Sequence, residues 1–299
     1  MPDRTTGEGR RIGILGTGLM GHAFAERFLD SGYPLSVYNR SPAKTRDLAE
    51  AGAQACASVS ELLQQCDTII LMLSNADAIR ELLPLNDDNS LQHRTLLQMA
   101  TISPQQSREL DKAISTCGGC YLEAPVLGSI PEAKAGTLII MTGGDKALFD
   151  SMLPVLQVLG NNPRYCGETG SAAALKLAMN QLIASLTAGF SLSLGYALKN
   201  GVDAGLFMDT VRESALYART YDKKLEKYLQ RDFGTANFST RHLLKDIRLF
   251  IDDARAAGLN TDALEGIERI TGQAVEKGMD LMDYSSIYEV ICPKNSGKN

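Results

Sequence analysis

The first half of the chain alternates short apolar runs with segments of helical periodicity. The runs are continuously apolar, which is typical of strands buried on both faces of a mainly parallel sheet. Six strands are predicted in this half, at residues 11–15, 35–39, 68–73, 95–99, 120–126 and 137–143. Helix-length segments separate the strands, so the pattern predicts a doubly wound α/β domain.

The pattern changes near residues 167–170, where strand-like runs stop. About 125 residues of helical periodicity follow, and the breakers within them are Asn200-Gly201, Gly234 and Gly258. We therefore predict two domains and a frayed tail. The α/β domain covers residues 11–167, the all-helical domain covers residues 168–293, and the tail follows.

The composition is that of a soluble globular enzyme of two domains, with 299 residues, of which 44% are hydrophobic. With 30 Lys plus Arg against 35 Asp plus Glu, the formal net charge is −5, and no basic block predicts a nucleic-acid partner. The apolar stretch 182–198 is shorter than a membrane span and predicts a buried helix. Residues 1–10 lack the apolar core of a secretory signal, so we expect a cytoplasmic protein without a membrane partner.

Six cysteines are too few for a disulfide scaffold in a chain of this length. Cys117 and Cys120 form C-G-G-C, but a thioredoxin-like pair follows a strand and opens a helix, whereas here a helix precedes and a strand follows. We predict loop thiols, with a redox pair as the alternative. The three histidines, His22, His93 and His242, are scattered singly, so no metal site is predicted.

The turn after the first strand has the pattern G-x-G-x-x-G and leads into a helix-length segment. Its residues are Gly16, Thr17, Gly18, Leu19, Met20 and Gly21. The first glycine allows a tight turn, the second lets a pyrophosphate approach the backbone, and the third lets the helix pack closely on the strand. This position in the chain predicts a Rossmann-type dinucleotide site, and a glycine-rich turn without a ligand is the alternative.

The second strand ends at Asn39-Arg40-Ser41, 18 residues after the last glycine of that turn. An Asp or Glu here would bind both ribose hydroxyls of NAD and repel a 2′-phosphate. An amide, a guanidinium and a hydroxyl favour a 2′-phosphate instead, so NADP (NADPH) is the predicted cofactor. The alternative is that Asn39 and Ser41 only cap the next helix while Arg40 lies in solvent.

Three later segments resemble motifs of the β-hydroxyacid dehydrogenase family. Residues 123–129 read E-A-P-V-L-G-S, like the family's substrate-binding signature, and residues 167–180 follow its catalytic pattern G-x-x-G-x-A-x-x-x-K-x-x-x-N. Lys245-Asp246 is similar to its cofactor-side K-D pair, and residues 16–21 to its G-x-G-x-M-G. Because the four motifs occur in the family's order across nearly the whole chain, the chain is identified as a member.

The lysine and asparagine of the catalytic motif are Lys176 and Asn180. They are four residues apart on a predicted helix, so they share one face about 6 Å apart along the axis. A lysine within an apolar helix is costly to bury charged, which makes it a candidate for a lowered pKa and for proton transfer. The resemblance implies that Lys176 is the general acid and that Asn180 holds the lysine or the substrate. A lysine that snorkels at a domain boundary is the alternative.

The substrate-binding motif predicts a loop of Leu127, Gly128 and Ser129 whose backbone N–H groups bind a carboxylate. A simple turn at the strand end is the alternative. The family usually has Ser at the position of Leu127, whose hydroxyl contacts the substrate carboxylate. The apolar side chain puts the identity of the substrate in question, while Glu123 and Ser129 favour the glyoxylate and succinic semialdehyde reductase branch.

Two further positions are assigned by the resemblance. Thr101 follows the fourth strand and is expected to face the nicotinamide or the substrate carboxylate, with a helix cap before Pro104 as the alternative. Lys245 is expected to reach the cofactor, and Asp246 to orient it and contact the substrate. An exposed ion pair on a helix surface is the alternative for Lys245 and Asp246.

The sequence therefore predicts an NADPH-dependent reductase of a small aldehyde or keto acid, reversible as a hydroxyacid dehydrogenase. The long apolar helix that begins near residue 171, together with the resemblance, predicts a homodimer or homotetramer. Reduction of a C=N bond, as in the related imine reductases, is one alternative, which Leu127 favours and Lys176 opposes. A non-catalytic nucleotide-binding module is the other, although such relatives typically lose the lysine.

Overall fold

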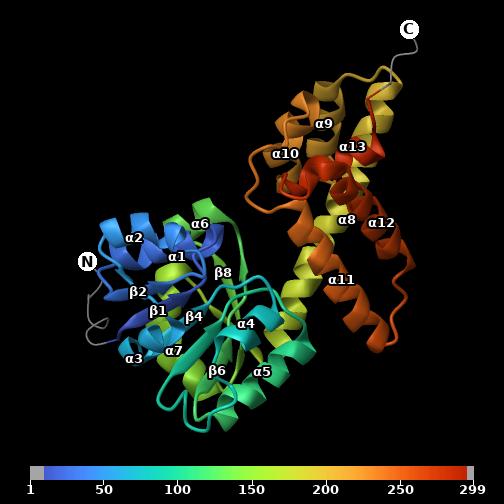
Figure 1. Cartoon of the computed structure of the whole chain (residues 1–299). Coiled ribbons are helices and arrows are strands. Elements are labelled where there is room, and N and C mark those ends of the chain that lie inside the picture. Colours follow the sequence, from blue (N-terminus) through green and yellow to red (C-terminus); the bar gives the residue numbers. More distant parts are fainter. Residues whose placement is uncertain (1–9, 295–299) are drawn as a thin grey trace. The chain divides into compact units, whose positions relative to one another are not determined.

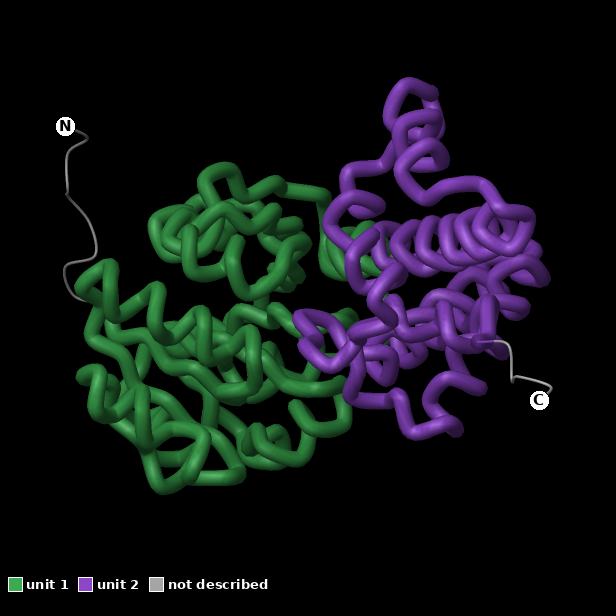
Figure 2. The backbone as a smooth tube through the Cα atoms, turned by 90° about the horizontal axis from the view of Figure 1, so that it is seen from above, with its two compact units in different colours: residues 1–177 green, residues 178–299 purple. Residues whose placement is uncertain are grey.

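The structure is a computed structural model that describes residues 10–294. The chain divides into two compact units, Met1–Leu177 and Ala178–Asn299 (Figures 1 and 2). The division lies within the long helix α8 (Ser171–Lys199), whereas the boundary predicted from the sequence precedes that helix. The tail expected to fray lies outside the described residues from residue 295 onward.

The first unit is built on a nine-stranded sheet whose order is β3-β2-β1-β4-β5-β6-β8-β7, with β9 paired to β8. The strands are β1 (Ile12–Leu15), β2 (Leu35–Tyr38), β3 (Gln54–Ala55), β4 (Thr68–Leu71), β5 (Thr95–Gln98), β6 (Cys120–Glu123), β7 (Val126–Leu127), β8 (Ile139–Gly144) and β9 (Arg164–Gly167). Strands β1 to β6 pair in parallel, while β8 runs antiparallel to β6 and β7. The prediction of a mainly parallel, doubly wound sheet is confirmed.

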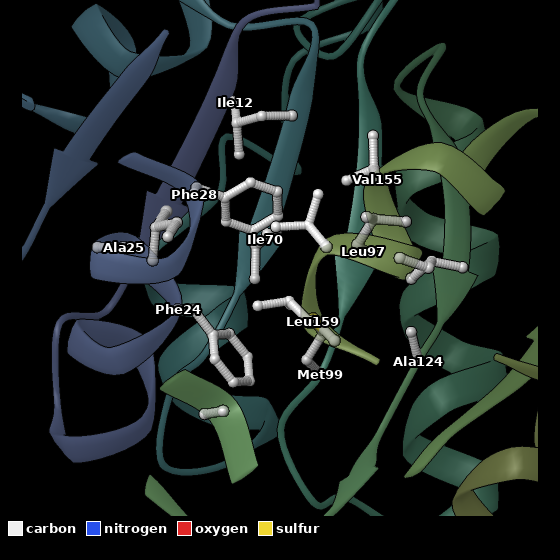
Figure 3. Packing of buried hydrophobic residues seen from close by; sticks show 14 of the residues in the cluster. Ile12, Phe24, Ala25, Phe28, Ile70, Leu97, Met99, Ala124, Val155 and Leu159 are labelled. Atoms are coloured by element: carbon white, nitrogen blue, oxygen red, sulfur yellow. The ribbon is translucent and has the colours of Figure 1, made fainter. Parts of the chain in front are cut away.

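Helices cover both faces of this sheet. They are α1 (Leu19–Asp30), η1 (Pro42–Thr45), α2 (Arg46–Glu50), α3 (Val59–Gln65), α4 (Ala76–Leu82), α5 (Pro104–Thr116), α6 (Ile130–Ala135) and α7 (Lys146–Leu159). Neighbouring strand residues point to opposite faces, so Ile70 packs with α1 and α7 (Figure 3), while Ile69 and Leu71 pack with α3, α4 and α5. Because both faces are buried, the central strands are mostly apolar, and this pattern made them predictable from the sequence.

The second unit is helical. After α8 it contains α9 (Ala204–Glu213), α10 (Arg219–Gln230), α11 (Thr240–Ala256), α12 (Asp262–Ala274), η2 (Val275–Met279), η3 (Tyr284–Ile287) and α13 (Tyr288–Ile291) (Figure 1). The predicted breakers fall between helices, and Gly201 and Gly258 adopt positive φ angles of 77° just after α8 and α11. Helix α8 is long and apolar enough to cross a membrane, a test that the core helix of a soluble protein also passes.

Candidate active site

The glycine-rich turn joins β1 to α1 in the first unit. Gly16 has a φ of 99°, and a Cβ atom there would lie 2.4 Å from the Met72 carbonyl oxygen. A Cβ on Gly21 would lie 1.9 Å from the Gly16 carbonyl oxygen, whereas a Cβ on Gly18 would meet nothing within 4 Å. The first and third glycines are thus required by the protein's own backbone, and the middle one faces open space. The N-cap of α1 is Gly18, which has no side chain to cap the helix, so the first N–H groups of α1 suit the pyrophosphate of a dinucleotide.

A cavity of about 450 Å³ opens beside this turn. Thr17, Gly18 and Leu19 line it, together with residues of α1, η1 and α2. Two of these residues, Lys44 and Arg46, are cations that the sequence analysis did not select. Their position shortly after the end of β2 was the signal that could have indicated them.

Asn39 connects the glycine-rich turn to the segment after β2. Its Oδ1 accepts a hydrogen bond from the Thr17 N–H at 3.2 Å, and its Nδ2 donates to the Ser41 carbonyl at 3.1 Å. Ser41 precedes η1, but its side chain forms no cap hydrogen bond. Arg40 is exposed, and among the described residues it makes no hydrogen bond or ion pair. Asn39 therefore links the glycine-rich turn to the segment after β2 by hydrogen bonds. The Arg40 guanidinium is available to an anionic ligand.

Thr101 lies between β5 and α5 and is half-buried. The cap of α5 is Ser103, whose Oγ accepts a hydrogen bond from the Gln106 N–H at 3.1 Å. The alternative in which Thr101 caps this helix is therefore wrong. Its assignment toward the nicotinamide or the substrate stays a prediction.

The predicted substrate loop follows β7 and leads into α6. Leu127 pairs opposite Ile139 in the antiparallel β7–β8 ladder and is half-buried. Ser129 donates two hydrogen bonds to Oε2 of Glu132, from its N–H at 2.9 Å and from its hydroxyl at 2.7 Å. A protein carboxylate thus already occupies the donors of Ser129 that we expected to bind a substrate carboxylate. Sequence analysis missed Glu132, although the S-x-x-E spacing of a helix cap could have indicated it.

Lys176 lies half-buried on α8, six residues after Gly170. The turn before the helix needs glycine, because Gly167 and Gly170 have φ angles of 129° and 104°. A Cβ on Gly170 would also lie 2.3 Å from Nη1 of Arg108. The glycines of the motif therefore build the start of the helix that carries Lys176.

In the second unit, Asn180 and Asp246 form a buried pair. Each is only 3% exposed, and Nδ2 of Asn180 donates to Oδ2 of Asp246 at 2.6 Å. Lys245 Nζ lies 3.0 Å from the other carboxylate oxygen of Asp246. Because Asp246 is buried, the alternative of an exposed ion-pair surface at Lys245 and Asp246 is wrong.

His242 lies one turn before Asp246 on α11. Its Nδ1 is 2.7 Å from Oγ of Ser239, and its ring stacks on Phe238 with the centroids 6.3 Å apart. Burial lowers the pKa of His242, and the positive charge of Lys245 lowers it further, while Asp246 opposes the shift. His242 stands alone among the histidines of the sequence, so no residue cluster indicated it as a site residue.

Two family models match this chain, one in its first half and one in its second half. Residues 11–167 match the family model described as the NAD binding domain of 6-phosphogluconate dehydrogenase, and residues 170–291 match that described as NAD-binding of NADP-dependent 3-hydroxyisobutyrate dehydrogenase. Glyoxylate/succinic semialdehyde reductase 1 of Arabidopsis thaliana is 30% identical over 285 residues, covering 94% of this chain and 98% of that protein.

This chain is a β-hydroxyacid dehydrogenase family member. Its class is that of NAD(P)-dependent hydroxyacid dehydrogenases and reductases. The 2-hydroxy-3-oxopropionate reductase of Escherichia coli is a further relative, at 27% identity, with 94% of this chain and 97% of that protein covered.

Solved structures share the fold of this β-hydroxyacid dehydrogenase. A 3-hydroxyisobutyrate dehydrogenase from Salmonella typhimurium superposes with a TM-score of 0.83 at 22% identity, covering 94% of this chain and 99% of that one. An imine reductase from Myxococcus stipitatus superposes with a TM-score of 0.64, also at 22% identity and with the same coverage. The Rossmann-type unit followed by a helical unit is thus common to both groups of structures.

The two cysteines of the C-G-G-C segment lie at the ends of neighbouring elements of the first unit. Cys117 is buried at the end of α5, and Cys120 is exposed at the start of β6, each as a free thiol. In residues 10–294 no group of three or more His, Cys, Asp or Glu side chains is arranged to hold a metal ion.

Proposed function

We propose that this protein is an NADPH-dependent reductase of a small aldehyde or keto acid similar to glyoxylate or succinic semialdehyde, and that it runs in reverse as a β-hydroxyacid dehydrogenase. The single observation that carries the proposal is the half-buried Lys176 near the start of α8, inside a catalytic motif of an NAD(P)-dependent family. The names of the relatives support the substrate class.

The residues of the first unit suit NADP. Open space at Gly18 and the uncapped N-terminus of α1 leave room and donors for the pyrophosphate. The exposed Arg40 guanidinium suits a 2′-phosphate, and no carboxylate stands at the end of β2 to repel it. When bound, the nicotinamide supplies the hydride. The cations Lys44 and Arg46 line the cavity beside Gly18 together with the carboxylates Asp47 and Glu50, so the exposed Arg40 carries the argument for a 2′-phosphate.

Lys176 supplies the proton. As the carbonyl carbon is reduced, its oxygen becomes alkoxide-like, and a nearby ammonium stabilises this charge and then donates a proton to form the hydroxyl group. In the reverse direction the neutral amine accepts that proton. In this proposal Asn180 and Asp246 bind the substrate, and Lys245, held by Asp246, serves the cofactor.

A substrate panel tests the proposal. The full chain is incubated with NADPH and, in separate reactions, with glyoxylate, succinic semialdehyde, methylmalonate semialdehyde and a cyclic imine. Loss of NADPH absorbance with one of the aldehydes is the expected result. Turnover of the imine alone would contradict carbonyl reduction and would support the first alternative below.

Reduction of a C=N bond is favoured by two features of the substrate loop. Leu127 is apolar, and the donors of Ser129 are bound to Glu132, so the loop suits a neutral substrate better than a carboxylate. Lys176 opposes this alternative, since imine reductases usually lack that lysine. A non-catalytic nucleotide-binding module is the other alternative, and the protein would then bind NADPH but turn over no compound of the panel.

We also propose that the protein assembles as a homodimer or homotetramer. Helix α8 exposes 63% of Leu192 and 72% of Tyr196, four residues apart on one face. Large apolar side chains gathered on one helix face are typical of surfaces that pair with a partner. Sedimentation equilibrium of the full chain tests this, and a monomer at all concentrations would contradict it.

A further inference from the structure

Glu123 is a completely buried carboxylate at the end of β6 that none of the roles above uses. It is 0% exposed, and it pairs opposite Gly143 of β8 in the sheet. A carboxylate in such a place is stable only if donors bind it. The donors that surround Glu123 therefore explain how this carboxylate can be buried.

Oε1 of Glu123 binds the N-terminus of α8. It accepts hydrogen bonds from the N–H groups of Gly170 at 2.9 Å, Ala172 at 2.8 Å and Ala173 at 3.4 Å. These N–H groups have no partner within the helix, and the positive end of the helix dipole lies there. The negative charge of Glu123 is thus stabilised by the start of the helix that carries Lys176.

Oε2 of Glu123 is bound from α5. The Ser107 hydroxyl donates to it at 2.5 Å, and the Tyr121 hydroxyl lies 2.8 Å from the same Ser107 oxygen. Since Ser107 gives its hydrogen to the carboxylate, Tyr121 is the donor to Ser107, and burial raises the pKa of Tyr121, which keeps its hydroxyl protonated. Both carboxylate oxygens are therefore held.

The sheet leaves room for this carboxylate at one position. A Cβ on Gly143 would lie 2.3 Å from Oε1 of Glu123 and 3.0 Å from the Glu168 carbonyl oxygen. The absent side chain of Gly143 is what allows the glutamate to reach the helix.

We infer that Glu123 is a positioning residue for the reaction: its carboxylate fixes the first turn of α8, and with it Lys176, on the end of β6. Ala172, whose N–H makes the 2.8 Å hydrogen bond, lies one turn before Lys176 on the same helix face. The residues directly after Glu123 lead into the predicted substrate loop, so the proton donor's helix is anchored at the end of the strand from which that loop starts. This inference rests on the proposed role of Lys176.

The test compares Glu123→Gln with Ser107→Ala in the full chain, using the aldehyde that the panel identifies. The glutamine is similar in shape but carries no charge, whereas Ser107→Ala removes the other hydrogen bond of Glu123 and leaves those to α8 in place. For Glu123→Gln we expect kcat to fall about 10- to 100-fold, the range for displacement of a catalytic group by about 1 Å. The Kd for NADPH should stay within about twofold, because the glycine-rich turn is untouched.

Hydrogen exchange gives a readout that does not depend on activity. Amides of residues 168–178 should exchange faster in Glu123→Gln than in the parent protein, and the increase should be smaller in Ser107→Ala. The kcat of Ser107→Ala should fall clearly less than that of Glu123→Gln, because the hydrogen bonds from Glu123 to α8 stay in place. Parent kcat and exchange in Glu123→Gln, or an equal loss of kcat in Ser107→Ala, would overturn the inference.

Glu123→Asp keeps the inference testable if Glu123→Gln does not fold. It retains the charge on a side chain one methylene shorter, so kcat should fall and residues 168–178 should exchange faster than in the parent, with NADPH binding unchanged. A kcat and an exchange rate in Glu123→Asp that both equal those of the parent protein would overturn the inference. If Lys176→Met keeps full turnover, the proposed function fails instead, and an effect of Glu123 on exchange in α8 would remain as a structural result.

Discussion

Asn180 of α8 and Asp246 of α11 are joined by a buried hydrogen bond of 2.6 Å. The two residues are 66 positions apart in the sequence and come from two different motifs of the family. The second unit therefore brings two of the predicted site residues together through a direct side-chain contact. The Asn180 amide thereby satisfies one oxygen of a carboxylate that is 3% exposed.

Asn180→Ala should destabilise the second unit, because it leaves Oδ2 of Asp246 buried without its donor. The expected loss of unfolding free energy is about 1 to 3 kcal/mol, measured by urea denaturation. Asn200→Ala is a matched control just after α8, since within residues 10–294 that exposed side-chain amide donates its one hydrogen bond to the Tyr196 carbonyl. Asn200→Ala should lower the free energy of unfolding by about 0.5 kcal/mol or less. Equal losses of unfolding free energy in the two variants would contradict the importance of the buried hydrogen bond.

Lys176→Met keeps the apolar stem of the side chain and removes the ammonium. If Lys176 is the general acid, turnover should fall by about 10² to 10⁴, because no other group is assigned to protonate the alkoxide. The fold and the NADPH affinity should persist, since a thioether is cheaper to bury than a charge. Lys199→Met, at the exposed end of the same helix, is the control. Near-normal turnover of Lys176→Met would remove the proposed mechanism.

Arg40→Ala should reduce the preference for NADPH over NADH. Loss of a charge-assisted contact to phosphate should narrow the difference in binding free energy between NADPH and NADH by about 1 to 3 kcal/mol. This difference is obtained from the ratio of the two Kd values. Arg164→Ala removes an exposed arginine of β9 and should leave that ratio unchanged. Equal affinities for both cofactors in the parent protein would show that Asn39, Arg40 and Ser41 do not select NADP.

Leu127→Ser and Glu132→Gln should each lower KM for carboxylated aldehydes. The first restores a hydroxyl donor to the loop, and the second removes the negative charge that competes for the donors of Ser129. A contact to a non-reacting carboxylate is mostly uniform binding, so kcat should change less than KM. A neutral aldehyde of similar size serves as the control substrate. A fall in kcat at constant KM would indicate that these side chains only pack the loop.

His242 should make the protein less stable as the pH falls. Burial, with help from Lys245, lowers the pKa of His242 in the folded state, so the unfolded chain binds the proton more readily. The free energy of unfolding should therefore fall as the pH drops below the unfolded value of about 6.5. His242→Gln should show a shallower fall between about pH 7.5 and 5.5 in denaturation experiments. An identical pH dependence in the two proteins would contradict this.

The central strands were predictable from the sequence, and the edges of the sheet were not. Strands β1, β2, β4 and β5 are mostly apolar because helices bury both of their faces. Strands β3 and β9 lie largely exposed and carry no such pattern. The single strand expected at 120–126 is in fact β6 and β7, since Pro125 interrupts the ladder between them.

The sequence predicts candidate positions for the site, but not which of their side chains contact one another. The spacing of Gly16, Gly18 and Gly21 predicts a tight turn and a helix packed closely on it, and the structure has both. Their role in binding a nucleotide stays a prediction. Which side chain binds which depends on tertiary packing. Asn39 bonds to Thr17 across 22 positions, and no local pattern marks that pair.

The missing side chain at Gly143 ties two positions together in evolution. While Glu123 reaches α8, a methyl group at position 143 has no space, so alanine there becomes acceptable only after the acid is shortened or lost. Substitutions at the two positions are then epistatic, and their order of appearance in a lineage is constrained. Descendants that abandon the carboxylate would be free to fill the gap in the sheet, and that second step would make the first difficult to reverse.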